Sequence, residues 1–437
     1  MFFGLDFGTT NSALALAPAT GASSLVPLHY RNEAFDTFRS ILYFEDGVRD
    51  ANGRSEPFAG PAAIDAYLEG ADGRLIQSIK SYLANPDFTS TSIYSSRFTI
   101  ENLIGFVVAR MIDATPYSHD LIERLKQSPV VAGRPARFVR NSMGQASDTA
   151  DEFAMERLET ALKGAGLPDI HFEFEPVAAA YAYESTLDHD ELVLIGDFGG
   201  GTSDFCLLHV GPGMREVSNR AETIIAVSGV GLAGDAFDAR IVEHCIAPQL
   251  GKGTFYKSTW GKTLPTPSWI YDSLKRWHQL SFLNTFKTRK MLEEIGPDSD
   301  KPDDIEALLH LIVENRGFDM YRAVEAAKVR LSSQEATKLE FRSGLINIES
   351  DVKRAEFDQW IAPELSEIAN CVDRLLEDAN ITTAKVDRVF LTGGSSFIPA
   401  VRNVFAERFG QAKLAGGGEL TSVATGLALS ARQRFGS

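Results

Sequence analysis

Two segments of this chain, about 190 positions apart, carry the same pattern, and this repeat constrains the fold more than any other feature of the sequence. In each copy an acid, Asp6 or Asp197, ends an apolar run, and Phe-Gly and a turn rich in Gly and hydroxyl residues follow. A second apolar run comes after each turn, which is the pattern of a β-hairpin. The separation is too long for a solenoid and suits a duplicated domain, so we expect two equivalent hairpins facing each other across a cleft.

The rest of the chain alternates strand-like and helix-like stretches. Residues 129–135 have the pattern of a buried strand and residues 149–164 that of an amphipathic helix, and such alternation predicts an α/β fold. A single long helix is expected over residues 356–380. Residues 250–320 contain three of the four Trp, and we interpret them as an inserted helical subdomain with an exposed acidic loop. Its tryptophans, Trp260, Trp269 and Trp277, are expected to form a small core, with a partner-docking surface as the alternative.

Charge and cysteine content exclude several classes of protein. The chain of 437 residues has a formal net charge of −16, which argues against a sequence-independent grip on nucleic acid or anionic lipid. Its 3 Cys do not form a C-x-x-C motif and exclude a disulfide framework and a Cys-based zinc site. No apolar run is long enough to span a membrane, and the N-terminal residues do not resemble a signal peptide. We therefore expect a cytoplasmic protein that binds neither nucleic acid nor membrane.

The two predicted turns have the chemistry of a phosphate site. Turns of Gly and Thr, such as 8–11 and 199–202, direct several backbone amides to one point and let a phosphate approach without a clash with Cβ. Asp6 and Asp197, each at a strand end, offer hard carboxylate oxygens to Mg²⁺. A further segment, Gly229–Gly234, follows a strand and opens a helix, and we expect its free amides to face a phosphate.

Four motifs in order resemble those of the 70-kDa heat-shock chaperones (DnaK type), a family of the actin-like ATPase superfamily. The segments are Gly4-Leu5-Asp6-Phe7-Gly8-Thr9-Thr10-Asn11-Ser12, Glu175-Pro176-Val177-Ala178-Ala179-Ala180, Asp197-Phe198-Gly199-Gly200-Gly201-Thr202-Ser203-Asp204 and Leu391-Thr392-Gly393-Gly394-Ser395-Ser396-Phe397-Ile398-Pro399. The resemblance covers nearly the whole chain. It is closest to short, YegD-like members, in which no peptide-binding β-sandwich follows, and we expect none here.

The resemblance implies a two-lobed actin-like ATPase, built from ribonuclease H-like duplicated domains with an inserted subdomain in each lobe. Lobe I would span residues 1–190, with a core of about 1–30 and 126–190 and an insertion of about 31–125. Lobe II would span residues 191–420, with a core of about 191–231 and 345–420 and a helical insertion of about 232–344. The final helix, about 421–437, would return to lobe I.

The resemblance also implies a role for individual residues. Lys80 would reach the γ-phosphate, Glu175 would lie near the attacking water, and Asp204 would be its partner on the second hairpin. Asp6 and Asp197 would lie around Mg²⁺. The remaining expected contacts to ATP or ADP are Gly8, Thr9, Thr10, Asn11, Gly199, Gly200, Gly201, Thr202, Gly234, Glu325, Lys328, Ser332, Gly393, Gly394, Ser395 and Phe397.

Three positions depart from the family pattern. Two arginines that enclose the adenine in the family are Val329 and Phe397 here, and only Phe397 can stack on a base. An acid near the start of the family's final helix is replaced by Leu420.

The sequence thus favours a slow, weak ATPase of the chaperone type, a monomer that binds Mg·ATP and signals to a protein partner not identified by the sequence. A small-molecule kinase for a sugar or an acid and an actin-like filament scaffold are the alternatives.

Overall fold

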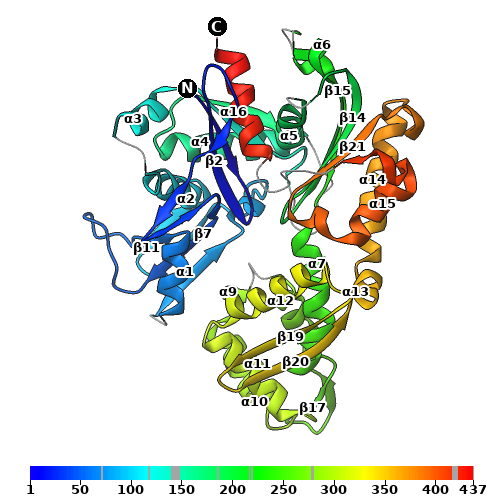
Figure 1. The fold of residues 1–437 in the computed structure, drawn as a ribbon. Helices are drawn as coiled ribbons and strands as arrows, with labels where there is room; N and C mark the ends of the chain where they lie inside the picture. Colours follow the sequence, from blue (N-terminus) through cyan, green and yellow to red (C-terminus); the bar gives the residue numbers. More distant parts are fainter. Residues whose placement is uncertain are drawn as a thin grey trace. The chain divides into compact units, whose positions relative to one another are not determined.

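The computed structural model describes residues 1–69, 72–116, 119–138, 148–184, 187–215, 217, 220–276, 280–415 and 422–436. The chain divides into two compact units (Figure 1). Unit 1 consists of Met1–Ala233, Glu367–Ser396 and Val401–Ser437, and unit 2 consists of Gly234–Ser366 and Phe397–Ala400. Each unit is described by itself. The lobe boundaries given above are not tested by this division and stay predictions.

The first sheet of unit 1 is built around the first predicted hairpin. Strands β1 (Phe2–Phe7) and β2 (Asn11–Ala17) pair antiparallel, with Asp6 opposite Ala13. On its other side β1 pairs parallel with β12 (Val130–Arg134), which pairs parallel with β13 (Ile170–Phe174). Short strands β3 (Ser24–Leu25) and β6 (Phe38–Arg39) extend the sheet beyond β2.

The second sheet of unit 1 repeats this topology. Strands β14 (Glu191–Phe198) and β15 (Ser203–Val210) form the second hairpin, in which Asp197 lies opposite Asp204. β14 then pairs parallel with β21 (Arg388–Thr392), which pairs parallel with β22 (Leu414–Ala415), while β16 (Ile224–Val230) extends the other edge. The equivalent strand orders confirm the duplicated α/β fold.

Two helices of small residues join the two sheets. α5 (Glu175–Glu184) and α16 (Ser422–Phe435) pack together and share one apolar cluster with Val131 of β12 and Ile195 of β14. α16 also packs on β1 and β2 through alanines, as Figure 1 shows for the red helix beside the blue strands. A Cβ on Gly426 would lie 1.7 Å from the carbonyl oxygen of Ala178, so the α5 and α16 backbones touch directly.

The other elements of unit 1 form an insertion between β2 and β12 and a set of helices near the sheets. The insertion contains β4 (Leu28–Tyr30), β5 (Glu33–Phe35), β7 (Ile41–Glu45), β8 (Phe58–Ala59), α1 (Pro61–Leu68), β9 (Gly73–Gln77), η1 (Ile79–Tyr82), β10 (Ser90–Ile93), β11 (Ser96–Thr99), α2 (Ile100–Asp113) and α3 (His119–Gln127). The others are α4 (Asp148–Gly164), α6 (Pro212–Arg215), η2 (Arg220–Thr223), η6 (Thr383–Lys385), η7 (Gly394–Phe397), α15 (Pro399–Phe409) and η8 (Gln411–Lys413), where η7 and α15 cross the division between the units.

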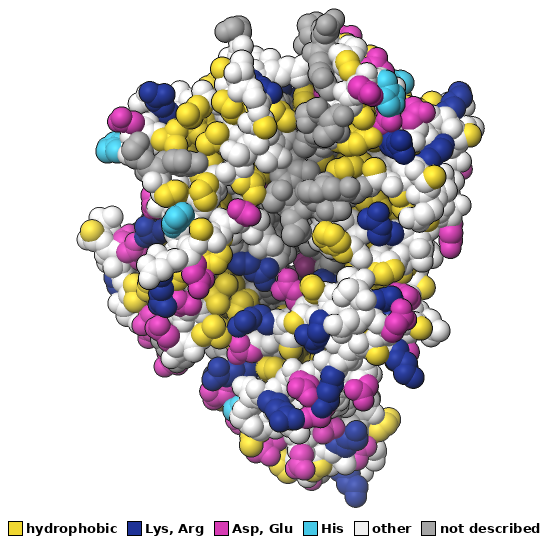
Figure 2. Space-filling view, viewed as in Figure 1, with side chains coloured by type: hydrophobic (Ala, Val, Ile, Leu, Met, Phe, Trp, Pro, Cys, Tyr) yellow, Lys and Arg dark blue, Asp and Glu magenta, His cyan; other side chains and the backbone are white. Residues whose placement is uncertain are grey.

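Unit 2 is mainly helical but also contains two hairpins. Its elements are α7 (Gly234–Ile241), η3 (Val242–Ile246), η4 (Ala247–Leu250), β17 (Phe255–Lys257), β18 (Thr263–Pro265), α8 (Ser268–Leu274), α9 (Leu280–Leu283), α10 (Phe286–Ile295), α11 (Pro302–Val313), α12 (Gly317–Leu331), β19 (Ala336–Ser343), β20 (Ile346–Lys353), α13 (Arg354–Trp360) and the first turn of α14 (Ala362–Asp378). Figure 2 shows charged side chains of both signs scattered over its visible face.

The single helix predicted over residues 356–380 is wrong, because α13 ends at Trp360 and α14 begins at Ala362. Pro363, in the first turn of α14, has no N–H to donate, and its ring excludes the carbonyl group four residues earlier. An unbroken helix through this position would therefore be strained.

The expected tryptophan core is also wrong for the residues that the structure describes. Trp260 is 89% exposed and Trp269 is 47% exposed, whereas Trp277 lies outside the described residues. The core of unit 2 consists instead of buried aliphatic and aromatic residues such as Leu308 and Tyr271. Within the described part of the chain, no helix combines the length and apolarity needed to cross a membrane.

Candidate active site

Backbone contacts shape both hairpin turns. A Cβ on Gly8 would lie 2.1 Å from the carbonyl oxygen of Asn11, so this position requires glycine. In the second hairpin the Gly199 amide donates to the carbonyl of Thr202 over 2.9 Å. Ser40 braces the first turn, because its hydroxyl donates to the carbonyl of Gly8 over 2.8 Å and its amide to that of Thr10 over 2.9 Å.

The acids of the second hairpin are buried within unit 1, whereas Asp6 of the first hairpin is half-buried. Asp197 and Asp204 occupy opposed positions on β14 and β15 and are 8% and 1% exposed. The Asp204 carboxylate accepts a hydrogen bond of 2.7 Å from the backbone amide of Ala136, in the segment after β12. The second hairpin is therefore tied to the first sheet, and the sequence carried no sign of this contact.

Lys80 and Glu175 form a buried ion pair in which Nζ and Oε1 are 2.6 Å apart. Glu175 begins α5, directly after β13, and Lys80 lies in the 3-10 turn η1. The residue before this turn, Ser78, is buried and has a left-handed backbone with φ of 53°, a conformation that is costly for a residue other than glycine. The structure thus brings together two predicted residues that lie 95 positions apart.

The cluster contains more acidic groups than basic ones. Burial, and then the charge of Glu175, raises the pKa of Asp6 to about 7 and that of Asp204 to about 7, and the same causes raise the pKa of Asp197. Burial alone would lower the pKa of Lys80, but the carboxylates of Glu175 and Asp6 outweigh it and raise this pKa. Four carboxylates share one ammonium group, so a bound cation would relieve their mutual repulsion.

This donor set fits Mg²⁺. Carboxylate oxygens are the ligands that Mg²⁺ prefers, and the ion keeps most of its waters and binds through one or two carboxylates. Among the described residues, no three acids come close enough together to hold a metal directly. Asp6 and Asp197, one from each hairpin, are the residues that would hold such a hydrated ion.

A polar clamp behind Lys80 escaped the sequence analysis. Arg157 of α4 is 7% exposed, and its guanidinium group donates to main-chain carbonyls of the segment that follows η1. The acceptors are Leu83 at 3.2 Å, Asn85 at 3.3 Å and Phe88 at 3.0 Å, and the Glu101 carboxylate pairs with Nε of the same side chain at 2.6 Å. Arg157 and Glu101 therefore fix the segment that positions Lys80. The burial of Arg157 is what reveals this role, and the burial of one arginine on a helix cannot be predicted from the sequence.

The glycine motif after β21 lies beside the second hairpin. β21 ends at Thr392, which lies opposite Asp197, and Gly393 follows with φ of 82°. A Cβ at Gly393 would lie 2.2 Å from the carbonyl oxygen of Phe198, so the backbone passes very close to β14. Gly394 and Ser395 follow in the same unit, whereas Phe397, 44% exposed, belongs to unit 2.

The residues expected to bind the nucleoside lie on α12 and α7 of unit 2. Lys328 is half-buried, and its ammonium group contacts the Asp238 carboxylate at 2.8 Å and the carbonyl of Gly234 at 3.3 Å. Glu325 lies one turn earlier on α12, and Ser332 caps the end of the helix. Asp238 is a residue that the sequence analysis missed, although it lies one turn after Gly234 in the helix that the glycine segment opens. Its Oδ1 is buried with no hydrogen-bond partner among the described residues, and burial raises its pKa to about 6.

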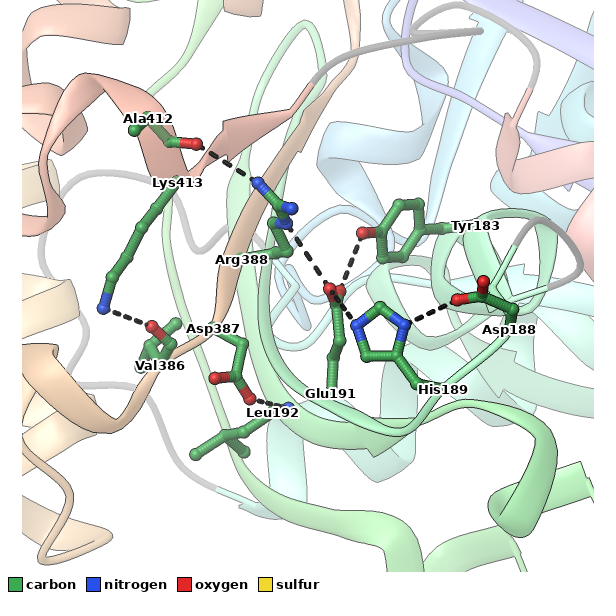
Figure 3. A network of polar contacts seen from close by, with 10 residues as sticks. All are labelled: Tyr183, Asp188, His189, Glu191, Leu192, Val386, Asp387, Arg388, Ala412 and Lys413. Atoms are coloured by element: carbon green, nitrogen blue, oxygen red, sulfur yellow. Dashed lines mark hydrogen bonds and ion pairs between the residues drawn. The ribbon is translucent and has the colours of Figure 1, made fainter.

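A second polar network anchors the opposite end of β14 from Asp197 (Figure 3). Glu191 is buried and accepts from the Tyr183 hydroxyl at 2.8 Å, while Nε2 of His189 lies 3.2 Å from its carboxylate and Nε of Arg388 lies 3.4 Å away. These side chains come from α5, the segment before β14, and β21. The Asp387 carboxylate also accepts a hydrogen bond of 2.8 Å from the Leu192 amide. Side-chain contacts therefore fix the first two residues of β14.

Comparisons with known proteins agree with this arrangement. A family model described as Hsp70 protein matches residues 156–253 and 316–436. Relatives include proteins named chaperone protein DnaK from Cyanidium caldarium, 24% identical over 92% of this chain and 56% of its own length, and Thermus thermophilus, 24% identical over 93% and 57%. The protein of that name from Halobacterium salinarum is 26% identical over 93% of this chain and 52% of its own length. The chain therefore spans little more than half the length of these relatives.

The resemblance to short, YegD-like members is not tested by these matches and stays a prediction. The matched residues include Glu175, Asp197 and Asp204 of the buried cluster and both elements of unit 2 that hold Lys328. Since the family model matches half of the chain, and the duplicated hairpins have the topology expected from the motifs, the chain belongs to the Hsp70 family.

Proposed function

We propose that this protein binds ATP and ADP with Mg²⁺ and hydrolyses ATP slowly, as a chaperone-like module that signals its nucleotide state to a protein partner. The observation that carries the proposal is a cluster of acids around Lys80: Asp197, Asp204 and Glu175 are buried and Asp6 is half-buried, and the three aspartates come from two equivalent hairpins. Such a cluster is costly to bury without a cationic ligand, and the glycine turns beside it suit phosphate groups.

Each residue then has a defined task. The turns at 8–11 and 199–202 bind phosphate oxygens through backbone amides, and Asp6 and Asp197 hold the hydrated ion. Mg²⁺ supplies charge neutralisation at the phosphates when it is bound. Lys80 offers its ammonium group to the terminal phosphate, which competes for it with Glu175.

Hydrolysis forms a bond from a water oxygen to the terminal phosphorus and breaks the bond from that phosphorus to the bridging oxygen of ADP. Glu175 and Asp204 orient the water, and a carboxylate at this point accepts its proton. Because phosphoryl transfer depends mainly on positioning and charge stabilisation, the clamp of Arg157 on the segment after Lys80 contributes indirectly.

We propose that Lys328, Glu325, Ser332, Gly234 and Phe397 of unit 2 contact the nucleoside, and that Gly393, Gly394 and Ser395 of unit 1 contribute to nucleotide binding. The support is the ion pair between half-buried Lys328 and buried Asp238, which fixes α12 against the start of α7. We also propose a cytoplasmic location, in keeping with the acidic composition.

Titration calorimetry and thermal unfolding with Mg·ATP test this function. A ligand bound only by the folded state stabilises it by about 2.7 kcal/mol at 100 times its dissociation constant, so the melting temperature should rise with Mg·ATP concentration. ATP without Mg²⁺, and Mg·GTP, serve as the comparison ligands. An unchanged melting temperature at millimolar Mg·ATP, together with a flat calorimetric trace, would show that the proposal is wrong.

A further inference from the structure

An apolar cavity of about 230 Å³ opens on the surface of unit 1, away from the acidic cluster. Four Phe and Tyr side chains form one part of its wall, His29, Arg110 and Asp113 add polar groups, and the first turn of α1 completes it. The Phe and Tyr residues of the wall are Tyr30, Phe35, Phe38 and Phe58, and Pro61 and Ala62 belong to α1. A cavity of about 150 Å³ lined by apolar side chains can hold benzene, so this one has room for a larger planar aromatic group.

The rim of the cavity is acidic. Five carboxylates, those of Glu33, Asp36, Glu56, Asp65 and Asp113, lie on or next to the lining elements, against the three guanidinium groups of Arg31, Arg39 and Arg110. Arg31 pairs with Asp65 at 3.0 Å, and Arg110 pairs with Glu56 and lies 3.5 Å from Asp113. Asp36, between two of the lining phenylalanines, is exposed and makes no ion pair with any described residue. The entrance to the cavity therefore has a net negative charge.

The hairpin β17–β18 of unit 2 presents an exposed aromatic side chain and basic residues. Trp260 lies in its turn and is 89% exposed, the highest exposure of any large apolar side chain in the described part of the chain. The turn is ordered by hydrogen bonds from the Gly261 amide to the carbonyl of Ser258 at 2.8 Å and from the Ser258 amide to the carbonyl of Lys262 at 2.8 Å. Holding Trp260 in place before contact lowers the entropy lost on binding.

Two exposed lysines flank this tryptophan. Lys257 ends β17 and Lys262 precedes β18, and neither makes an ion pair with any described residue. The chain as a whole is strongly acidic, so an unpaired basic pair beside an exposed indole is a local exception. Such a group suits a partner that offers an aromatic-lined cavity with an acidic rim.

We propose that copies of this chain associate by inserting Trp260 of one copy into the cavity of unit 1 of another. The indole fills the space between the aromatic walls, and Lys257 and Lys262 face the carboxylates of the rim. The inserted hairpin and the accepting cavity are different parts of the chain. After one contact, the copy that inserts Trp260 still has a free cavity, and the copy that accepts it still has a free Trp260. Association therefore builds rings or chains rather than being limited to a symmetric dimer.

The contact is expected to be weak, since one hairpin tip buries much less than the roughly 1,200 Å² of a standard stable interface. It should also weaken with added salt, because exposed charges contribute to it. Sedimentation velocity of the full chain, from low micromolar to the highest soluble concentration, measures the association. We expect a concentration-dependent rise in the weight-average sedimentation coefficient for the parental protein.

Two variants separate the two halves of the contact. Trp260→Ala removes the inserted group, and Ala62→Phe fills the cavity from its half-exposed wall; each should weaken self-association at least tenfold. Trp269→Ala, which removes a 47% exposed tryptophan outside the hairpin, is the matched control and should associate like the parental protein. Thermal unfolding of all three checks that the fold is unchanged.

Mixing provides the decisive measurement. The Trp260→Ala chain retains a free cavity and the Ala62→Phe chain retains its tryptophan, so an equimolar mixture should form a one-to-one complex that neither forms alone. N-acetyltryptophanamide should compete with it. A parental protein that stays monomeric throughout, a Trp260→Ala chain that associates normally, or a mixture that stays monomeric would each overturn the proposal. Binding of the monomer to phosphatidylglycerol vesicles through Trp260, without self-association, would assign the hairpin to membranes instead and would overturn it as well.

Discussion

Lys80 and Glu175 neutralise each other in a buried pair, and we expect both to serve hydrolysis more than nucleotide binding. Lys80→Ala and Glu175→Gln should bind Mg·ATP with little change in affinity but lower the single-turnover rate by ~10²–10³, as is typical for the loss of one preorganised electrostatic contact. Calorimetry and rapid-quench hydrolysis measure the two effects separately.

Lys163→Ala and Glu159→Gln, which break an exposed ion pair within α4, are the controls and should leave both quantities unchanged. Parental hydrolysis by Lys80→Ala would show that another cation reaches the terminal phosphate.

Asp204 makes the stability of the ligand-free protein depend on pH. Its pKa is raised from 3.8 to about 7 in the folded state, so between these values the folded protein holds a proton that the unfolded chain has released. Stability from this group is therefore present at low pH and is lost as the pH rises from about 4 to about 7. A pKa difference of one unit corresponds to about 1.4 kcal/mol, so the loss amounts to a few kcal/mol.

Asp204→Asn keeps an acceptor for the Ala136 amide but does not titrate. Urea unfolding in EDTA should therefore show a smaller fall in stability between pH 5 and pH 8 for this variant than for the parental protein. Asp378→Asn, at the exposed end of α14, controls for the change in net charge. Equal slopes for all three proteins would contradict the raised pKa of Asp204.

Among individual residues, the sequence predicted the site residues that belong to repeated motifs. Asp6 and Asp197 follow from the repeat alone, because strand, acid and glycine turn occur twice. The meeting of Lys80 with Glu175 was indicated only by the family resemblance. Arg157 and Asp238 were missed, since a polar side chain on a helix reads as exposed until tertiary packing buries it and provides its partner.

Among the elements, α5 and α16 make the closest contact. A methyl group at Gly426 would meet the main chain of Ala178, which cannot rotate away, so Gly426→Ala forces the two helices apart. We expect a loss of about 1–3 kcal/mol or more in the free energy of unfolding, in the range of overpacked cores. Gly164→Ala at the end of α4 meets nothing within 4 Å and should stabilise by up to about 1 kcal/mol.

Urea denaturation at fixed pH gives both free energies. If Gly426→Ala were as stable as the parental protein, the direct contact between the two backbones would be disproved.

The sequence predicted local elements well where one short pattern determines them. Both hairpins follow from apolar alternation around a glycine turn, and α5 follows from its proline in the first turn. The break between α13 and α14 was present in the sequence as Pro363, but the strong amphipathic pattern on both sides concealed it. Trp260 was misplaced because size and apolarity predict burial on average, whereas the tip of a hairpin has no neighbours to cover a side chain.

For the whole molecule, the reactivity of the cysteine thiols measures how well the fold shields its interior from solvent. Cys206, Cys245 and Cys371 are all buried, at 0%, 5% and 5% exposure, and burial raises the pKa of each thiol. Because the thiolate is the reactive form, Ellman's reagent should titrate no thiol rapidly in the native protein and three after denaturation.

The slow native reaction then reports opening of each unit, since Cys245 lies in unit 2 and the other two lie in unit 1. A Cys245→Ser variant identifies which phase belongs to unit 2. Rapid reaction of any thiol in the native protein would show that its unit is open in solution.

The position of α16 has a consequence for biosynthesis. Strands β1 and β2 leave the ribosome roughly 400 residues before the helix that covers them. Contacts of such high sequence separation form slowly, and an uncovered sheet face is prone to aggregation. The nascent chain must therefore keep the alanine face of β2 exposed while the intervening residues are translated, so this face stays unprotected long after its strand is made.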